Sequence, residues 1–267
     1  MDAEMGTGML ASIAPEASLL LGAGRAILLQ LADPRIGIAV VRHSNFVDNP
    51  MSRLHNTLAY VYALGAGNAA QRAVVIDYVN KAHKPVHAPR DDIAGTPAYS
   101  ARDPKLQLWV AATLYESADV VAQQTLPRLT QVEQDELYRE YVCLGQALQM
   151  PDSMWPADRA AFRNYFERSI KELQVGPEVS EAAEQLFRGH NTPWWVRIFL
   201  PLAKDLTIAL LPQRVRELYG YQLTTRVRVT ATVILKLVGG ANRILPKFVR
   251  HAPMRWSLRR IDGGALG

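Results

Sequence analysis

The segment 103–123, DPKLQLWVAATLYESADVVAQ, constrains the fold of this chain more than any other stretch. Asp103 can cap a helix, and Pro104 suits the first helical position because no backbone N–H is needed there. The side opposite the main apolar stripe is also poor in charge, which is typical of a helix buried on most of its surface. We therefore predict a buried central helix. Its stripe consists of Leu106, Trp109, Val110, Thr113, Leu114 and Ala118.

Other apolar segments predict further helices around this one. Thr130 and Glu133 form a capping box that marks the start of one of them. The segment 85–102 is punctuated by proline and glycine and is expected to be a loop. No segment shows the strong alternation that predicts a sheet. The expected helices are 18–32, 35–42, 50–63, 69–84, 130–149, 155–173, 177–187, 193–211, 212–219 and 223–238.

These segments predict an all-α fold, with one globular domain of about ten helices over residues 18–238. Residues 1–17 are expected to form a flexible N-terminus, and residues 239–267 a basic tail with a short helix at most. The single cysteine, Cys143, excludes an intramolecular disulfide and a cysteine-based zinc cluster. The chain also lacks a signal-peptide pattern and a spanning segment, so a cytoplasmic protein is expected.

The charge of the chain is concentrated toward its C-terminal end. From Arg188 onward, 14 Lys/Arg and 3 Asp/Glu give a net charge of +11, whereas the first 187 residues, with 16 Lys/Arg and 22 Asp/Glu, give −6. This basic region indicates an anionic partner or an anionic membrane face, or else a solvated surface. Nucleic acid is not expected, because no nucleic-acid-binding motif is present.

The apolar run 194–211 contains charged residues that would be costly in hydrocarbon, so a spanning helix is not expected. Two interpretations remain open. The run either packs against the core or lies in the surface of an anionic membrane. In the second case the side chains among the lipid headgroups would be Trp194, Trp195, Phe199, Leu202 and Leu206.

Four blocks of the sequence carry a resemblance to a known family: 22–46, 95–104, 145–166 and 210–220. They include GAGRAILLQLADPRIGIAVVRHSNF and GQALQMPDSMWPADRAAFRNYF. Together with the central segment, they resemble the bacterial and fungal family that includes latex-clearing protein (rubber oxygenase) and the mycophenolic-acid-pathway oxygenase. The resemblance extends over most of the chain and implies an all-α, globin-like core that binds haem b.

Two positions depart from the family pattern. In that pattern the central helix carries a histidine after its Trp-Val pair, and in latex-clearing protein this histidine is the proximal iron ligand. The position is Ala111 here, and Asp33 also stands where many relatives have a histidine. Because alanine cannot bind iron, either another residue ligates the haem or this chain no longer uses it.

The resemblance makes His83 the first candidate for iron ligand or distal catalytic base. It lies in the segment AHKPV, near the C-terminal end of an expected helix, and matches a family histidine. The neighbouring region supplies a distal lysine in latex-clearing protein, which makes Lys84, or Lys81, a candidate cofactor contact. Alternatively, His83 is stabilised by the helix dipole alone. His43 matches the family's His-Ser-x-Phe block and is a candidate catalytic or pocket residue, or else a loop anchor.

Arg25 is a candidate for binding a haem propionate or a substrate carboxylate, because a guanidinium pairs bidentately with such groups. The alternative is an arginine that ties helix ends together. Trp109 and Thr113 are expected to contact the cofactor from the central helix, and Tyr62 and Tyr115 could line the same pocket. For each of these four residues, core packing is the alternative.

Two functions follow from these expectations. The first is a haem-b-dependent oxygenase that acts on an apolar, isoprenoid or lipid-like substrate. The second is a non-catalytic protein that has lost haem and binds a hydrophobic ligand or a membrane surface. Other chemistries lack their motifs, since the sequence has no Gly-x-Ser-x-Gly, His-Glu-x-x-His or Gly-x-Gly-x-x-Gly.

Overall fold

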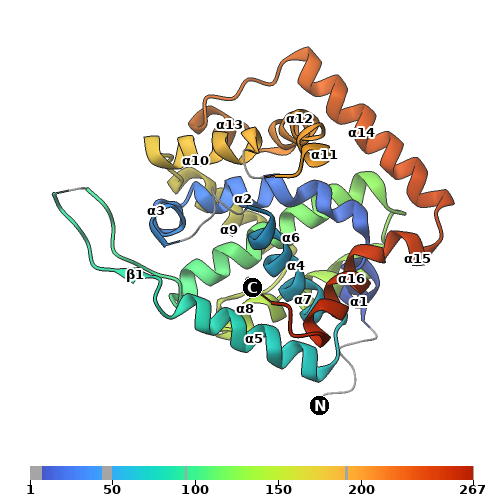
Figure 1. Cartoon of the computed structure of the whole chain (residues 1–267), viewed down its shortest axis with the longest axis horizontal. Helices are drawn as coiled ribbons and strands as arrows, with labels where there is room; N and C mark the ends of the chain where they lie inside the picture. Colours follow the sequence, from blue (N-terminus) through green and yellow to red (C-terminus); the bar gives the residue numbers. More distant parts are fainter. Residues whose placement is uncertain (1–7, 44–49, 94, 190–191, 267) are drawn as a thin grey trace.

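Helix α6, Pro104–Thr125, runs through the middle of the molecule and is buried on most of its surface (Figure 1). As predicted, the Asp103 side chain caps its start by accepting a hydrogen bond from the backbone N–H of Lys105, at 2.9 Å. Pro104 occupies the first turn, where its missing N–H costs nothing. The central helix of the sequence prediction is therefore confirmed.

The computed structural model describes residues 8–43, 50–93, 95–189 and 192–266, and within them the all-α class is confirmed. Several expected helices are broken in two; 130–149, for example, forms α7 and α8. The other helices are α1 (Met9–Ile13), η1 (Ala17–Gly22), α2 (Ala23–Leu31), α3 (Pro34–His43), α4 (Pro50–Ala66), α5 (Ala69–His83), α7 (Gln131–Glu140), α8 (Cys143–Gln146), η2 (Asp152–Met154), α9 (Arg159–Glu172), α10 (Pro177–Arg188), α11 (Trp194–Arg197), α12 (Leu200–Leu210), α13 (Gln213–Leu218), α14 (Thr225–Ile244), α15 (Lys247–Arg250) and α16 (Ala252–Asp262).

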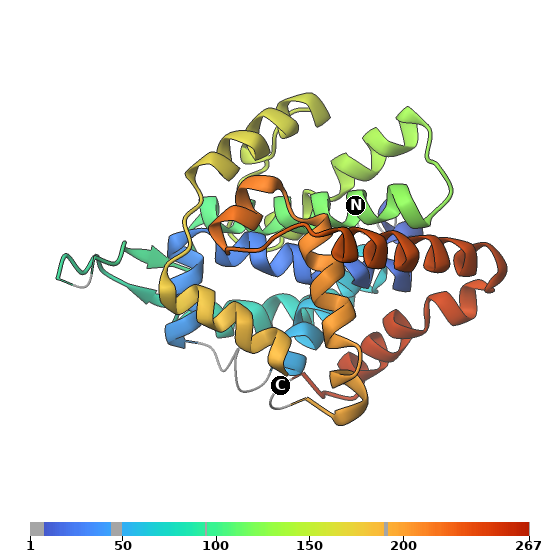
Figure 2. The same cartoon turned by 90° about the horizontal axis from the view of Figure 1, so that it is seen from above.

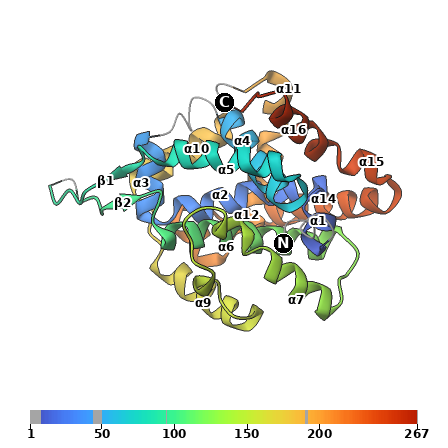
Figure 3. The same ribbon diagram turned by 90° about the horizontal axis from the view of Figure 1, so that it is seen from below.

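An aromatic cluster joins α6 to α7 and α9, which lie together on one side of it (Figure 3). The rings of Tyr115 and Phe162 meet edge to face, with centroids 4.9 Å apart. Tyr138 and Trp155 stack at 5.3 Å, and each also approaches Phe162. Such ring pairs bury large apolar areas and add directional contacts. This side of α6 is therefore densely filled.

Helix α6 also packs against η1 and α2. Helix α6 and η1 meet closely at Gly22, the last residue of η1. A Cβ added to this glycine would lie 2.9 Å from the carbonyl oxygen of Ser117 on α6. Trp109 is buried, and its indole N–H donates to the carbonyl of Leu29 at 3.1 Å. These contacts fix α2 along α6.

The last helices close the fold, which corrects the expectation of a basic tail with a short helix at most. Helix α14 runs past residue 238 to Ile244, and α16 packs against α4 and α5. Ile261 is buried, and Asp262 accepts a hydrogen bond from the side chain of Gln71 at 3.0 Å. Long-range packing, which local sequence patterns do not encode, explains why this part was missed.

The N-terminal segment is likewise packed within its described part. Leu10 on α1 is buried, and its backbone N–H donates to Glu140 at 2.6 Å. Glu16 is 5% exposed and binds Arg250 at 2.5 Å and His251 at 3.0 Å. The expected flexible N-terminus therefore does not extend to residue 17. Residues 1–7 of that prediction lie outside the described residues.

The expected loop 85–102 contains a small hairpin. Strands β1 (His87–Ala88) and β2 (Tyr99–Ser100) pair antiparallel, with His87 opposite Ser100. The hairpin projects from the helical body beside α3 and α5 (Figure 1). Its inner residue Tyr99 is buried against Ile38 and Ala39. The hairpin thus anchors the end of α3, where His43 lies.

Candidate functional site

Two neighbouring cavities lie beside α6. We call them the apolar cavity, about 580 Å³, and the histidine cavity, about 490 Å³. Both volumes fall in the range of about 300–1,000 Å³ that small-molecule and cofactor sites occupy. Four residues line both cavities and so form a shared wall: Gln30, Arg53, Thr57 and Leu114.

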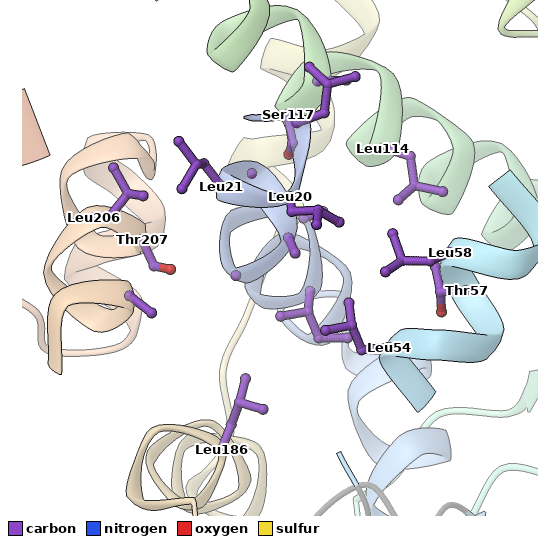
Figure 4. Close-up of a pocket in the computed structure, with 18 of the residues that line it drawn as sticks. Leu20, Leu21, Leu54, Thr57, Leu58, Leu114, Ser117, Leu186, Leu206 and Thr207 are labelled. Carbon is purple, nitrogen blue, oxygen red and sulfur yellow. The ribbon is translucent and has the colours of Figure 1, made fainter. Parts of the chain in front are cut away.

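Aliphatic side chains line most of the apolar cavity (Figure 4). Leu58 of α4 and Leu114 of α6 lie next to each other in its lining, and Leu20 of η1 lies near them. Leu186 of α10 and Leu206 of α12 complete the far side. A cavity with this lining favours an apolar ligand, because few polar groups are available to bind a polar one.

The histidine cavity contains the two histidines that the sequence singled out. His83, at the end of α5, has a buried Nδ1 atom with no hydrogen-bond partner among the described residues. Burial, together with the positive charge of Arg53, lowers the pKa of His83 to about 4. The ring is therefore neutral near pH 7, and the neutral ring is the form that binds metal ions.

His43 and Ala111 line the same cavity from other elements. His43 is exposed at the end of α3, so it marks an edge of the cavity that solvent reaches. Its Nε2 atom lies 2.8 Å from the hydroxyl of Tyr99, which holds the ring in place. Ala111 contributes only a methyl group from α6, so the position that carries a histidine in the family pattern leaves free space here.

Polar groups are gathered on the wall between the two cavities. Burial lowers the pKa of Arg53, which stays positively charged at neutral pH because guanidinium groups titrate far above it. The Gln30 amide donates to the Thr113 hydroxyl at 3.0 Å, and that hydroxyl in turn donates to the Val110 carbonyl at 2.8 Å. The wall thus contains a buried cation and an amide whose orientation is fixed by a hydrogen bond.

Four predicted site residues do not line either cavity. The Arg25 guanidinium binds Glu116, the Ser117 hydroxyl at 2.9 Å and the Leu210 carbonyl at 2.8 Å. This network ties α2 to α6 and α12, which matches the structural alternative for Arg25. Lys84 is exposed beyond the end of α5.

Trp109 and Thr113 are also placed differently from the prediction. Trp109 stacks on Phe166 at 5.3 Å, within the densely filled side of α6. Thr113 is fully buried and reaches the cavities only through its hydrogen bond to Gln30. Both residues belong to the buried stripe of α6 because apolar neighbours surround them.

Sequence reasoning missed two residues that line the histidine cavity, Arg53 and Tyr60. The Tyr60 hydroxyl donates to the Leu144 carbonyl at 2.7 Å, and burial raises its pKa. Arg53 had a usable signal, since it is the one Lys, Arg, Asp or Glu residue in the segment 50–66. A single charged residue in an otherwise uncharged helical segment indicates a specific binding or structural role, because arginine is rarely buried without one.

The described part of the chain contains no group of three or more His, Cys, Asp or Glu residues that could hold a metal ion by itself. A haem iron makes a smaller demand, because the porphyrin supplies four ligands and the protein needs one axial donor. His83 has a buried ring nitrogen, Nδ1, that has no hydrogen-bond partner among the described residues. His83 therefore has the kind of donor atom that an iron porphyrin in the histidine cavity would require.

Comparison with known proteins agrees with the resemblance noted in the sequence. A family model described as "ER-bound oxygenase mpaB/B'/Rubber oxygenase, catalytic domain" matches residues 11–240. The chain is 30% identical over 225 residues to uncharacterized proteins of Mycobacterium bovis and Mycobacterium tuberculosis. Each alignment covers 82% of this chain and 87% of the relative. No solved structure matches the chain significantly.

Proposed function

The chain belongs to the family of the mpaB and rubber oxygenase catalytic domains, and from this premise we propose that it is a haem-b-dependent oxygenase acting on an apolar substrate. In this proposal the histidine cavity holds the cofactor, and the apolar cavity holds the substrate. The shared wall brings the two within reach of each other, since Leu114 and Thr57 border both spaces.

The observation that carries the proposal is the buried, unpartnered Nδ1 atom of His83 in the same cavity as Ala111. A buried polar atom without a partner costs about 1–3 kcal/mol, so its persistence calls for an explanation. Binding of the ring to a haem iron is the explanation that we propose. His83 would then replace the ligand that is lost at Ala111.

Haem b, when bound, would supply the activation of dioxygen, which no protein side chain provides. The residues of this chain would bind and orient the reactants around it. His83 would bind the iron, and Arg53 would pair with a propionate carboxylate through its planar guanidinium. The aliphatic lining of the apolar cavity would exclude water and hold the substrate by apolar contact.

The absorption spectrum of the purified protein, before and after addition of haemin, tests the proposal. We expect an intense haem band in the wild type that is lost in His83→Ala. His55→Ala is the matched control, because His55 lies on α4 outside both cavities and contacts the ring of Trp256 at 5.0 Å. A wild-type protein that stays colourless and takes up no haemin would rule out the haem proposal.

Ala111 supports a second candidate, a protein that binds an apolar ligand without catalysis. With the family's ligand position reduced to a methyl group, the two cavities would serve as one hydrophobic binding site. This candidate predicts no haem band, but an increase in the fluorescence of a pyrene-labelled fatty acid on binding. Leu114→Trp would reduce that binding, because the larger side chain occupies the shared wall.

A further inference from the structure

Large apolar side chains are exposed where α11 leads into α12. Trp194 is 74% exposed, and Trp195, Ile198 and Phe199 are each more than half exposed. Leu202 follows at 44%. Their spacing of about four residues along consecutive helical turns gathers them on one face. Soluble monomers rarely expose so many large apolar groups together unless the surface binds something. We call this face the α11–α12 patch.

One residue expected on this face has a different role. Leu206 is buried and packs with Ala231 and Leu235 of α14. The α11–α12 patch therefore ends at Leu202, and the rest of α12 holds α14 in place. This division shows that the patch is not a loosely attached helix, because its continuation is part of the packed structure.

The helices that follow the patch combine apolar and basic side chains. On α14, Val229, Val233 and Leu237 are exposed at intervals of four residues, which gives one stripe. Figure 2 shows α12 running up to α14, with α15 and α16 beyond the far end of α14. Phe248 on α15 and Trp256 on α16 are exposed as well.

Cations with no ion-pair partner in the described structure accompany these apolar residues. They are exposed and spread over the same helices, whereas Asp205, one of the 3 acidic residues after Arg188, is buried and paired with Arg226 at 2.8 Å. The region therefore presents an excess of positive charge. The exposed cations are Arg197, Arg228, Lys236, Arg243, Lys247 and Arg259.

The α11–α12 patch is also an opening of the apolar cavity. Phe199 and Leu202 are exposed, and both line that cavity. Val196 and Ala203 line it from the same two helices. A ligand could therefore pass between these side chains without crossing the helical core. The same residues would contact a lipid surface and the cavity contents.

We propose that the protein docks on an anionic lipid bilayer through the α11–α12 patch and the basic helices α14–α16, and that its apolar cavity takes up ligand directly from the lipid phase. Exposed tryptophan beside aliphatic residues suits the headgroup boundary, and unpaired cations suit anionic lipid. The docking of the protein on the bilayer does not depend on the proposed function, whereas the uptake of ligand into the apolar cavity rests on it. Among the described residues, no helix combines the length and apolarity needed to cross a membrane.

Flotation with vesicles of phosphatidylcholine containing about 30 mol% phosphatidylglycerol tests the docking, because anionic lipid attracts basic side chains near the membrane surface. We expect the full-length wild type to float with these vesicles and to bind pure phosphatidylcholine far more weakly. The double variant Trp194→Glu/Trp195→Glu should lower the bound fraction about tenfold, since two anchors are replaced by carboxylates. Val132→Glu, on α7 and 73% exposed, is the matched control and should bind like the wild type.

Two results would overturn docking. One is equal binding by the wild type and the Trp194→Glu/Trp195→Glu variant. The other is a wild-type protein that binds neither vesicle type but forms a dimer, when the Trp194→Glu/Trp195→Glu variant stays monomeric. That result would mean that the α11–α12 patch binds a second copy of the chain. Circular dichroism of each variant checks that the fold is retained.

Uptake from the bilayer is measured separately, with vesicles that carry a pyrene-labelled fatty acid. We expect the excimer signal to fall as wild-type protein removes the probe, and Leu114→Trp to slow this loss without reducing flotation. Flotation without any transfer of the probe would overturn uptake and leave docking supported. A wild-type protein that shows no haem band and takes up no haemin would instead rule out the oxygenase proposal, so the two failures are distinguishable.

Discussion

The two sides of α6 differ, although they belong to one helix. On one side, Trp109 and Tyr115 are enclosed by rings from α7, α9 and the segment before α9. On the other side, Ala111 and Leu114 border two cavities. No aromatic ring of α6 borders the cavities, and Ala111 contributes only a methyl group to the lining of one of them. The comparison indicates that one face stabilises the fold, whereas the other borders the space in which we propose that a ligand binds.

The contrast also explains which predicted residues were misplaced. Composition marks both faces of α6 as apolar, and an apolar stripe does not reveal whether it meets side chains or empty space. Trp109 and Thr113 were expected at the cofactor, yet both lie where packing is complete. A face suited to binding is distinguished by what lies opposite it, and that depends on distant parts of the chain.

The largest expected effect comes from emptying the filled face. Phe162→Ala removes a ring whose centroid lies within 6 Å of those of Tyr115, Tyr138 and Trp155. We expect the free energy of unfolding to fall by about 3–5 kcal/mol, because a buried aromatic side chain is lost and a cavity remains. Chemical denaturation monitored by circular dichroism measures the change.

The matched control for this prediction is Phe187→Ala, since Phe187 lines the apolar cavity and is partly exposed. It should cost less than half as much, because fewer contacts are lost at a surface that already borders empty space. Equal losses in the two variants would contradict the division between a filled and an open face.

A second pair adds volume to the two faces at neighbouring positions. Ala112 is fully buried and lines neither cavity, whereas Ala111 borders the histidine cavity. Ala112→Leu is expected to lower the free energy of unfolding by about 1–3 kcal/mol through overpacking. Ala111→Leu should leave stability within about 0.5 kcal/mol of the wild type, because the new side chain enters free space.

The same two variants separate stability from binding. Ala111→Leu should abolish uptake of haemin although the protein remains folded, and Ala112→Leu should retain uptake wherever it remains folded. Thermal denaturation and a haemin titration of both variants give the comparison. If Ala111→Leu proved as destabilising as Ala112→Leu, the histidine cavity would not offer the space that its volume indicates.

The smallest expected effect is the pH dependence that His83 imparts to the haem-free protein. Its pKa is lowered from 6.5 to about 4 in the folded state, so the unfolded chain binds more protons between these values. Stability therefore falls as the pH drops from about 6.5 to 4, by roughly 1–2 kcal/mol once partial exposure of the ring is allowed for.

The variant His83→Gln removes this titration, and its free energy of unfolding should change less over the same pH range. Denaturant midpoints measured at several pH values between 4 and 7 make the comparison. An unchanged slope would mean that the ring of His83 is not held in a site that disfavours its charge.

Much of the fold could be predicted from local patterns. Asp103 and Pro104 specified the start of α6, and Thr130 with Glu133 specified the start of α7 by a capping box that the structure contains. These capping interactions involve residues only a few positions apart, so they can be predicted without knowledge of the tertiary structure. The C-terminal helices could not be predicted in the same way, because α16 is held by packing on α4 from the other end of the sequence.

The candidate site was predictable only in part. His83 and His43 were selected by resemblance, and both line the histidine cavity. Arg25 was selected from its neighbouring glycines, but its partners Ser117 and Leu210 lie 92 and 185 residues away and occupy its guanidinium. Arg53 was missed, although it is the lone cation of its segment. Which of two arginines faces a cavity is decided by contacts between distant segments.

The ion pair between Glu16 and Arg250 joins residues 234 positions apart. During synthesis, Glu16 leaves the ribosome long before Arg250 exists, at a translation rate of about 5–20 residues per second. Until then its carboxylate has no partner from this pair, and α4 lacks the cover that α16 later provides. In the nascent chain, this flank of α4 therefore stays uncovered until α16 has been made.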